Sequence, residues 1–329
     1  MLEHRVQRGE RLILEDIYRD IKEDLIKVEE LLKEALSDDN PFIHHINDYL
    51  LTFQGKRLRP AMVLLTASAF NYQGEEKIKL ATAIELIHTA TLVHDDIIDE
   101  ADTRRFSPTL NARFSPQIAV LVGDLLYARA LYMLAGQVDS EITRVMAASV
   151  NQVVTGEIEQ ISHCYNQALT QTQYLEIIAK KTGSLMAACS QTAAMLAGRS
   201  PQEVEILRDG GLKVGIAFQI VDDCLDLTSR ESRLGKPVRN DYHRGKLTLP
   251  LIYALSRARE EERKTPDNIF EWASEQIAEL LDRYEAIDYS FQVVKKYVDE
   301  AKEKLEIIEK KESRERLKKL FDYIVEREY

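Results

Sequence analysis

Two groups of three aspartates lie far apart in the chain and share one spacing, in which the second and third aspartates follow the first by one and four residues. Both groups follow a strongly apolar run, where three negative charges are costly unless cations bind them. Mg²⁺ accepts carboxylate oxygens together with water and substrate phosphate oxygens. The groups therefore predict a site for metal-bridged diphosphate. Their members are Asp95, Asp96, Asp99, Asp222, Asp223 and Asp226.

A helix would bring the first and third aspartates of each group onto one face, about one turn apart. Asp95 would then lie above Asp99, and Asp222 above Asp226. Two such faces on opposite sides of a cavity could hold several divalent cations. The alternative is that each group is a solvated helix end. That alternative suits a single copy better than two copies that follow the apolar runs TATLV and IAFQIV.

Basic residues recur close to both acidic groups. Arginine binds phosphate through a planar fork, and lysine binds it as a point charge. Each of these residues alone is typical of a protein surface, but their recurrence beside the aspartates favours a site with room for two anionic substrates. They are Lys56, Arg57, Arg59, Arg104, Arg105, Lys180, Lys181, Lys236 and Lys246.

Apolar residues recur every three or four positions through most of the chain, which predicts an all-α fold in a single domain over residues 1–329. The segment from Ile78 to Asp99 is apolar on nearly every face, so the first acidic group is expected at the end of a buried helix. The charged stretch 260–286 is interpreted as a peripheral insertion. The other predicted helices begin at Leu14 and Phe42 or span 61–70, 117–136, 141–161, 172–196, 201–227, 249–259, 294–308 and 317–324.

The composition excludes several classes of protein. The chain has 329 residues, 45% of them hydrophobic, and its net charge of −11 argues against a nucleic-acid-binding surface. Cys164, Cys189 and Cys224 form no CxxC pair, which favours a reducing cytoplasm over a disulfide framework or a zinc site. No signal-peptide core and no sufficiently long apolar stretch is visible, so we expect a soluble cytoplasmic protein.

Several strings of residues occur in order between Gly55 and Pro250: GKRLRP, HTATLVHDDIIDEADTRR, GDLLYARA, GEIEQ, KTGSL, FQIVDDCLD, and GKPVRND followed by GKLTLP. In order and spacing they resemble the trans-isoprenyl diphosphate synthases, the polyprenyl synthetase family, and within it the long-chain octaprenyl and heptaprenyl synthases. The resemblance implies an isoprenoid-synthase-type helical bundle around a deep central cavity, usually in a homodimer. It also implies a reaction in which an allylic diphosphate ionises, isopentenyl diphosphate attacks the cation and a proton is lost.

The resemblance assigns metal ions to the acidic groups. Asp95 and Asp99 would bind two Mg²⁺ ions on the allylic diphosphate, with Asp96 contributing more weakly. Asp222 would hold a further ion, supported by the other two aspartates of its group, for a total of about three Mg²⁺ ions per site. The motif-bearing core implied by the matching strings covers about residues 42–259.

The resemblance also assigns the substrates. The residues that would clamp the allylic diphosphate are Arg104, Lys181 and Lys236, with Lys246 nearby. Those that would bind isopentenyl diphosphate are Gly55, Lys56, Arg59, His88 and Arg105. Thr182 and Gln219 would line the reacting centre, where their dipoles could steady a developing carbocation. A lone histidine in an apolar helix, such as His88, is also typical of a satisfied core residue.

Product length should depend on the residues just before Asp95, because the growing tail must run along the helix away from the metal ions. Short-chain members of the family usually carry Phe or Tyr at one of the two positions that Ala90 and Thr91 occupy here. These small side chains predict an open tunnel and a product of roughly 30 to 50 carbons, unless they merely permit close helix packing. Deeper walls could come from Ala83, Ile87, Val153 and Val154.

Two departures from the family pattern are visible. Phe106 stands where the family commonly has Gly, which puts the loop over the site in question, and KTGSL replaces a more usual KTA-type string. Neither change removes a charged ligand. We also expect a peripheral contact with a membrane when a long apolar product is released.

Other functions fit the residues less well. A terpene cyclase would carry a different second motif and lack GKRLRP, and a head-to-head synthase also lacks that basic loop. A short-chain farnesyl or geranylgeranyl synthase remains the nearest alternative. A non-catalytic prenyl-diphosphate-binding subunit would tolerate losses in one acidic group, and neither group has lost an aspartate. The residues leave open whether a second small subunit is required.

Overall fold

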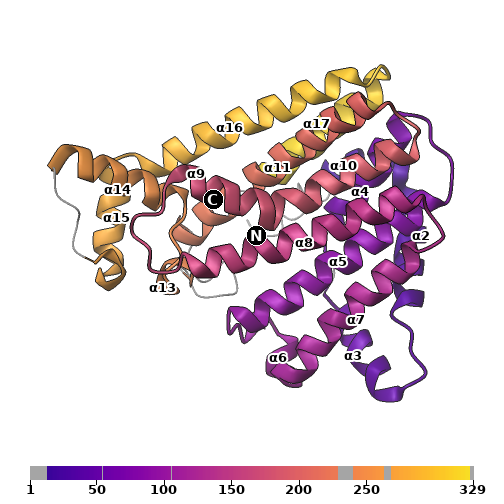
Figure 1. Ribbon diagram of the computed structural model, residues 1–329, viewed down its shortest axis with the longest axis horizontal. Helices are drawn as coiled ribbons and strands as arrows, with labels where there is room; N and C mark the ends of the chain where they lie inside the picture. Colours follow the sequence, from indigo (N-terminus) through magenta and orange to yellow (C-terminus); the bar gives the residue numbers. More distant parts are fainter. Residues whose placement is uncertain (1–12, 54, 105, 229–239, 263–267, 327–329) are drawn as a thin grey trace, which may run out of the picture.

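The computed structural model describes residues 13–53, 55–104, 106–228, 240–262 and 268–326, and most of them are helical (Figure 1). The only sheet among these residues is a hairpin of β1 (Thr103–Arg104) and β2 (Ser107–Pro108), so the all-α prediction is confirmed. The helices, with η for 3₁₀ and π turns, are η1 (Arg19–Ile21), α2 (Lys22–Ala35), α3 (Pro41–Leu51), α4 (Leu58–Ala69), α5 (Glu76–Ile98), α6 (Leu110–Arg113), α7 (Pro116–Leu134), α8 (Ser140–Ser162), α9 (Gln171–Ile178), η2 (Ala179–Gly183), α10 (Ser184–Leu196), α11 (Pro201–Thr228), α13 (Asn240–His243), α14 (Leu249–Glu262), η3 (Ile269–Glu271), α15 (Ser274–Arg283), α16 (Ala286–Lys304), η4 (Leu305–Ile307) and α17 (Lys311–Val325).

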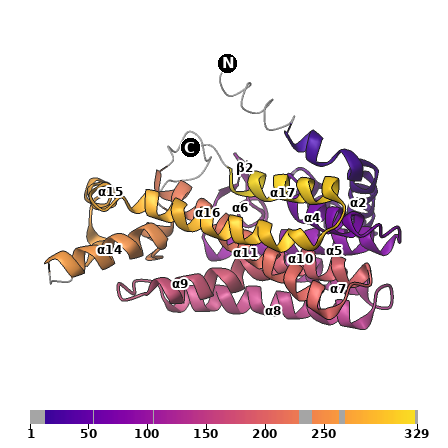
Figure 2. The ribbon, with the colours of Figure 1, turned by 90° about the horizontal axis from the view of Figure 1, so that it is seen from above.

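The helices are stacked in layers, which can be followed in Figure 2, where the molecule is seen from above. Helices α8 and α9 form one layer, α10 and α11 the next, and α16 and α17 the third. Contacts join α10 to α8 and α11, and α11 to α16. Helix α4 packs on α10 and α5, and α5 packs on α7. Helices α5 and α11, which carry the two acidic groups, are therefore enclosed by other helices.

The buried side chains form two hydrophobic clusters, and α11 contributes to both. Val93, just before the first acidic group, belongs to one cluster, together with Val214 from the first part of α11. Val221, just before the second acidic group, belongs to the other, together with Ile220 and Leu227. The segments that precede the two acidic groups therefore belong to different clusters, and α11 links the two clusters.

Two predicted helices are interrupted. The helix expected from Leu14 contains the 3₁₀ turn η1, next to which the hydroxyl of Tyr18 donates to the carbonyl of Lys56 at 2.7 Å. The helix expected over 172–196 contains the π turn η2 between α9 and α10. A π turn inserts an extra residue and is often found at functional sites. Here it falls on Lys181 and Thr182.

The stretch 260–286, interpreted as a peripheral insertion, contains a packed helix in its described part. Helix α15 lies within it, and Ile277, Leu280 and Leu281 on that helix are buried in the second hydrophobic cluster. The charged residues occupy the other face of α15, so a high local charge hid an amphipathic helix.

Candidate active site

The first acidic group lies in the last turn of α5. Asp96 is buried, Asp95 is half-buried, and Asp99 caps the helix, where its N–H donates to the carbonyl of Asp95 at 2.7 Å. The carboxyl end of a helix carries a partial negative charge that disfavours carboxylates. Burial raises the pKa of Asp95 to about 6, although the positive charge of Lys181 acts in the opposite direction. Repulsion from Glu157 and Asp99 adds to the increase. This position favours a bound cation.

Asp96 faces a different partner. Nε of Arg104 donates to Oδ1 and Oδ2 of Asp96 at 2.9 and 3.0 Å, and Nη2 donates to Oδ1 at 2.7 Å. Arg104 comes from β1, so the short hairpin fixes this guanidinium beside the acidic group. Phe106 lies at the turn of the hairpin with φ +64°, a backbone conformation that suits Gly, and its ring is 73% exposed. Arg105 lies outside the described residues.

Residues 241–246 connect the two acidic groups. Nζ of Lys246 lies 2.9 Å from Oδ1 of Asp99, and Nη1 of Arg244 lies 3.2 Å from the same atom. At the other end, the N–H of Asp241 donates to Oδ2 of Asp226 at 3.2 Å. Burial opposes ionisation of Asp99, but Lys246 outweighs it and lowers the pKa of Asp99. Asp95 and Asp99 thus differ in pKa although they share a face. Lys236 lies outside the described residues.

Lys181 lies on the π turn and faces helix α8. Its ammonium forms an ion pair with Glu157 and donates to Oε1 of Gln160 at 2.8 Å. A Cβ at Gly156 would lie 2.5 Å from the backbone nitrogen of Lys181, so only Gly allows α8 this close. Burial opposes the charge of Lys181, but Asp95 and Glu157 outweigh it and raise the pKa of the ammonium. Lys181 therefore stays charged beside the first acidic group.

The second acidic group lies in the last two turns of α11, and its members have different surroundings. Asp222 is half-buried, whereas Asp223 and Asp226 are buried. Asp223 accepts hydrogen bonds from the hydroxyl of Tyr174 at 2.6 Å and from Nε2 of Gln219 at 2.8 Å. Asp222 is the most accessible carboxylate of the three.

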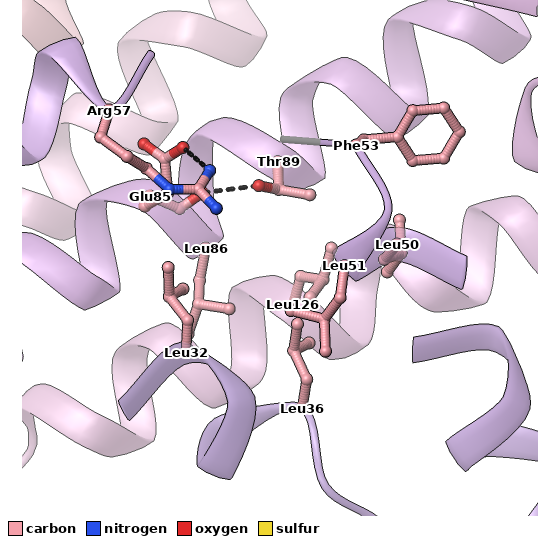
Figure 3. Close-up of a pocket in the computed structure, with 10 residues that line it drawn as sticks. All are labelled: Leu32, Leu36, Leu50, Leu51, Phe53, Arg57, Glu85, Leu86, Thr89 and Leu126. Atoms are coloured by element: carbon pink, nitrogen blue, oxygen red, sulfur yellow. Dashed lines mark hydrogen bonds and ion pairs between the residues drawn. The ribbon is translucent and has the colours of Figure 1, made fainter. Parts of the chain in front are cut away.

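The two arginines of the basic string GKRLRP, Arg57 and Arg59, have different partners. Arg57, at φ +53°, turns into the protein and pairs with Glu29 and, at 2.7 Å, with Glu85 (Figure 3). Arg59 instead lies 3.0 Å from Nε2 of His88 through Nη1. Arg59 and His88, both predicted ligands of isopentenyl diphosphate, are therefore brought together by α4 and α5.

Gly55 and Lys56 complete this loop. A Cβ at Gly55 would lie 3.4 Å from Nη1 of Arg57, and Nζ of Lys56 lies 5.1 Å from the ring centroid of Tyr323 on α17. The carboxyl-terminal helix therefore forms part of the surroundings of the basic loop.

Figure 3 shows a leucine-lined cavity beneath the Arg57–Glu85 pair, which borders Leu86 and Thr89 of α5 rather than Ala90 or Thr91. Ile87 and Ala90 are fully buried, and the hydroxyl of Thr91 donates to the carbonyl of His88 at 2.7 Å.

Of the deeper walls predicted for the tunnel, Val153 is buried but Val154 is 45% exposed on the outside of α8. Successive residues of a helix point about 100° apart, so both cannot face the interior. The assignment of Val154 to a wall inside this chain is therefore wrong.

Sequence reasoning missed several polar residues that contact the predicted site. Glu157 and Gln160 hold Lys181, Arg244 reaches Asp99, and Tyr174 reaches Asp223. Glu157 and Gln160 lie in the string GEIEQ, which could have pointed to them. The partner of Tyr174 lies 49 positions away, a separation that no spacing rule covers.

Comparisons of this chain with known proteins agree with the geometry of the site. The family model described as polyprenyl synthetase matches residues 40–287. The chain belongs to the polyprenyl synthetase family. The heptaprenyl diphosphate synthase component 2 of Geobacillus stearothermophilus is 38% identical over 96% of this chain and 99% of its own length. The short chain isoprenyl diphosphate synthase of Methanothermobacter thermautotrophicus is 36% identical over 92% of this chain and 95% of its own.

A solved structure agrees as well. The polyprenyl synthase from Caulobacter crescentus CB15, complexed with calcium and isoprenyl diphosphate, superposes with a TM-score of 0.87 at 32% identity, covering 96% of this chain and 98% of the other. As a member of the polyprenyl synthetase family, the present chain is a prenyltransferase that makes prenyl diphosphates. The relatives differ in product length, so they leave the product of this chain open.

Proposed function

We propose that this prenyltransferase condenses isopentenyl diphosphate with an allylic diphosphate in a Mg²⁺-dependent reaction and makes a long-chain, all-trans product. The observation that carries the proposal is the connection through residues 241–246, which joins Asp226 of the second acidic group to Asp99 of the first. It favours one site with carboxylates and cations from both groups.

The donor set suits Mg²⁺. The half-buried carboxylates of Asp95, Asp99 and Asp222 are hard oxygen ligands. Burial, followed by repulsion from Glu157 and Asp99, raises the pKa of Asp95, and a bound cation would favour its ionised form. Among the described residues, no three His, Cys, Asp or Glu side chains converge on a ready-made metal site. Mg²⁺ commonly uses few carboxylates and completes its shell with water and substrate phosphate. The family resemblance implies about three such ions per site.

The protein's own side chains would act on the two substrates. Arg104 and Lys181 stabilise the negative charge that grows on the allylic diphosphate as its carbon–oxygen bond breaks. Bound Mg²⁺ would add Lewis-acid stabilisation of that leaving group. Arg59 holds isopentenyl diphosphate so that its double bond attacks the allylic cation. The departing diphosphate takes up the proton, and no side-chain nucleophile is needed.

A long product is favoured by the residues one turn before Asp95. Ala90 and Thr91 offer no bulky side chain that would stop a growing tail. A heptaprenyl synthase component among the relatives agrees with a long product, and a short chain synthase among them keeps the shorter alternative open.

A second copy of the chain is the expected partner. Helices α7 and α8 are neighbours, and together they expose a set of large apolar side chains, which monomers rarely leave in water. Among the described helices, α7 is also the one that is long and apolar enough to cross a membrane, a property that core helices of soluble proteins share. The exposed residues are Val120, Leu121, Leu131, Tyr132, Val154, Ile158 and Ile161.

The assay is incubation of the purified protein with Mg²⁺, isopentenyl diphosphate and allylic primers of several lengths, followed by chromatography of the dephosphorylated products. We expect long products that disappear when EDTA removes the metal. A product that stops at 15 or 20 carbons with every primer would contradict the long-chain proposal. Light scattering of the wild type and of Leu121→Glu tests the dimer, because a buried glutamate at its interface should give monomers.

A further inference from the structure

Tyr174 begins a chain of hydrogen bonds that ends at Thr182. Its side chain on α9 is 3% exposed, and its hydroxyl donates to Oδ2 of Asp223 at 2.6 Å. Oδ1 of Asp223 accepts from Nε2 of Gln219 at 2.8 Å. Oγ1 of Thr182 then donates to Oε1 of Gln219 at 2.6 Å. Three segments, α9, α11 and the π turn, are linked in this way.

The two ends of the Gln219 amide have different partners. Its Nε2 donates to Asp223, and its Oε1 faces the hydroxyl of Thr182. The amide oxygen can only accept, so the hydroxyl proton of Thr182 points at Gln219. The lone pairs of Thr182 are then directed away from Gln219. Lone pairs are the end of a hydroxyl dipole that stabilises a positive charge.

We propose that Tyr174 is a positioning residue that, through Asp223 and Gln219, orients the hydroxyl of Thr182 towards the developing carbocation. The inference rests on the proposed placement of Thr182 at the reacting centre. It also gives Asp223 a role that its spacing did not predict, because both of its oxygens have protein partners. Asp223 then orients Gln219, and the more accessible Asp222 binds metal.

Loss of the Tyr174 hydroxyl would leave Oδ2 of Asp223 without this partner in a buried place. A buried carboxylate that loses a donor tends to rotate or to take up water. Gln219 could then flip its amide, and Thr182 would lose its fixed direction. The effect should appear in the chemical step rather than in substrate binding.

The first experiment is a double-mutant cycle of Tyr174→Phe and Thr182→Val. We expect Tyr174→Phe to lower kcat roughly tenfold with both KM values unchanged, and to have no further effect once Thr182 is Val. The matched control is Tyr289→Phe, since the hydroxyl of Tyr289 donates to Gln171 on the same helix α9 at 2.9 Å and should be dispensable for kcat. Independent, multiplicative effects of the two substitutions, or an unchanged kcat in Tyr174→Phe, would overturn the proposal.

The second experiment does not depend on turnover and uses calorimetry of inorganic diphosphate binding in the presence of Mg²⁺. Tyr174→Phe and Asp223→Asn should bind as tightly as the wild type, whereas Asp222→Asn should bind at least about tenfold more weakly. Asp223→Asn also serves if Tyr174→Phe does not fold. Equal weakening by Asp223→Asn and Asp222→Asn would make Asp223 a metal ligand and refute the relay. A wild type that binds Mg²⁺-diphosphate but forms no product would count against the proposed function instead.

Discussion

Nζ of Lys246 lies 2.9 Å from Oδ1 of Asp99, although the two residues are 147 positions apart in the chain. Lys246 is only 7% exposed, so water screens this contact little. A lysine that follows the second acidic group thereby neutralises a carboxylate of the first. The contact makes the two groups electrostatically dependent on each other.

Replacement of Lys246 by Gln should therefore weaken binding of the allylic diphosphate. A charge-assisted hydrogen bond is lost, so the KM for the allylic substrate should rise roughly tenfold. The KM for isopentenyl diphosphate should change little. Steady-state kinetics with each substrate varied in turn makes the comparison, and an equal rise in both KM values would speak against a specific role for Lys246.

Lys180 and Lys181 are adjacent but should differ sharply. The side chain of Lys181 is 17% exposed and pairs with Glu157, while that of Lys180 is 34% exposed and pairs with Glu159 at 2.6 Å. Lys181→Gln removes a cation next to the developing charge and should lower kcat/KM for the allylic substrate roughly a hundredfold. Lys180→Gln is the control and should keep near-wild-type kinetics. Similar losses in both variants would mean that the π turn does not separate their roles.

Arg57 and Arg59 offer a second contrast. Arg57→Gln leaves the buried Glu85 without its cation, so we expect the free energy of unfolding to fall by about 2 to 3 kcal/mol with KM values unchanged. Arg59→Gln should instead raise the KM for isopentenyl diphosphate at nearly constant stability. Urea unfolding and steady-state kinetics of both variants separate the effects. A raised KM in Arg57→Gln would show that its guanidinium reaches the substrate.

Asp95 should reduce the stability of the metal-free protein above pH 6. The native carboxyl keeps its proton up to a pKa of about 6, against an ordinary value of 3.8, so stability falls as pH rises between these values. At pH 8 and with EDTA present, Asp95→Asn should raise the free energy of unfolding by up to about 3 kcal/mol. The gain should vanish below about pH 4. Urea unfolding at both pH values measures it, and an equal gain at pH 8 and pH 4 would contradict the assignment.

Ala90→Phe should shorten the product while the first condensations continue. Ala90 is fully buried, so the larger ring also costs about 1 to 3 kcal/mol of stability through overpacking. Thr89→Phe is the matched control and should leave the product length unchanged, because Thr89 borders the leucine-lined cavity of Figure 3 and not the predicted tunnel. Chromatography of dephosphorylated products compares the three proteins. An unchanged product in Ala90→Phe would place the wall elsewhere.

The sequence by itself predicted the parts of this protein that depend on local patterns. The apolar character of nearly every face of 78–99 located the buried helix that carries the first acidic group, and the apolar pattern over 201–227 located the helix that carries Asp222. Charge and spacing identified the aspartates and most of the cations near them. The family followed from the order of these strings.

Tertiary structure decided which of these charges meet. Spacing set the middle aspartate of each group apart from the other two but named no partner for it, and the structure shows that Asp96 is held by Arg104 and Asp223 by Tyr174. Arg104 comes from the hairpin after α5 and Tyr174 from another helix, and a helical repeat contains no information about neighbouring elements. Arg57 and Arg59 likewise look equivalent in GKRLRP, but the left-handed backbone at Arg57 turns one inward and leaves the other beside His88. The types of residue were set locally, and their roles were set by packing.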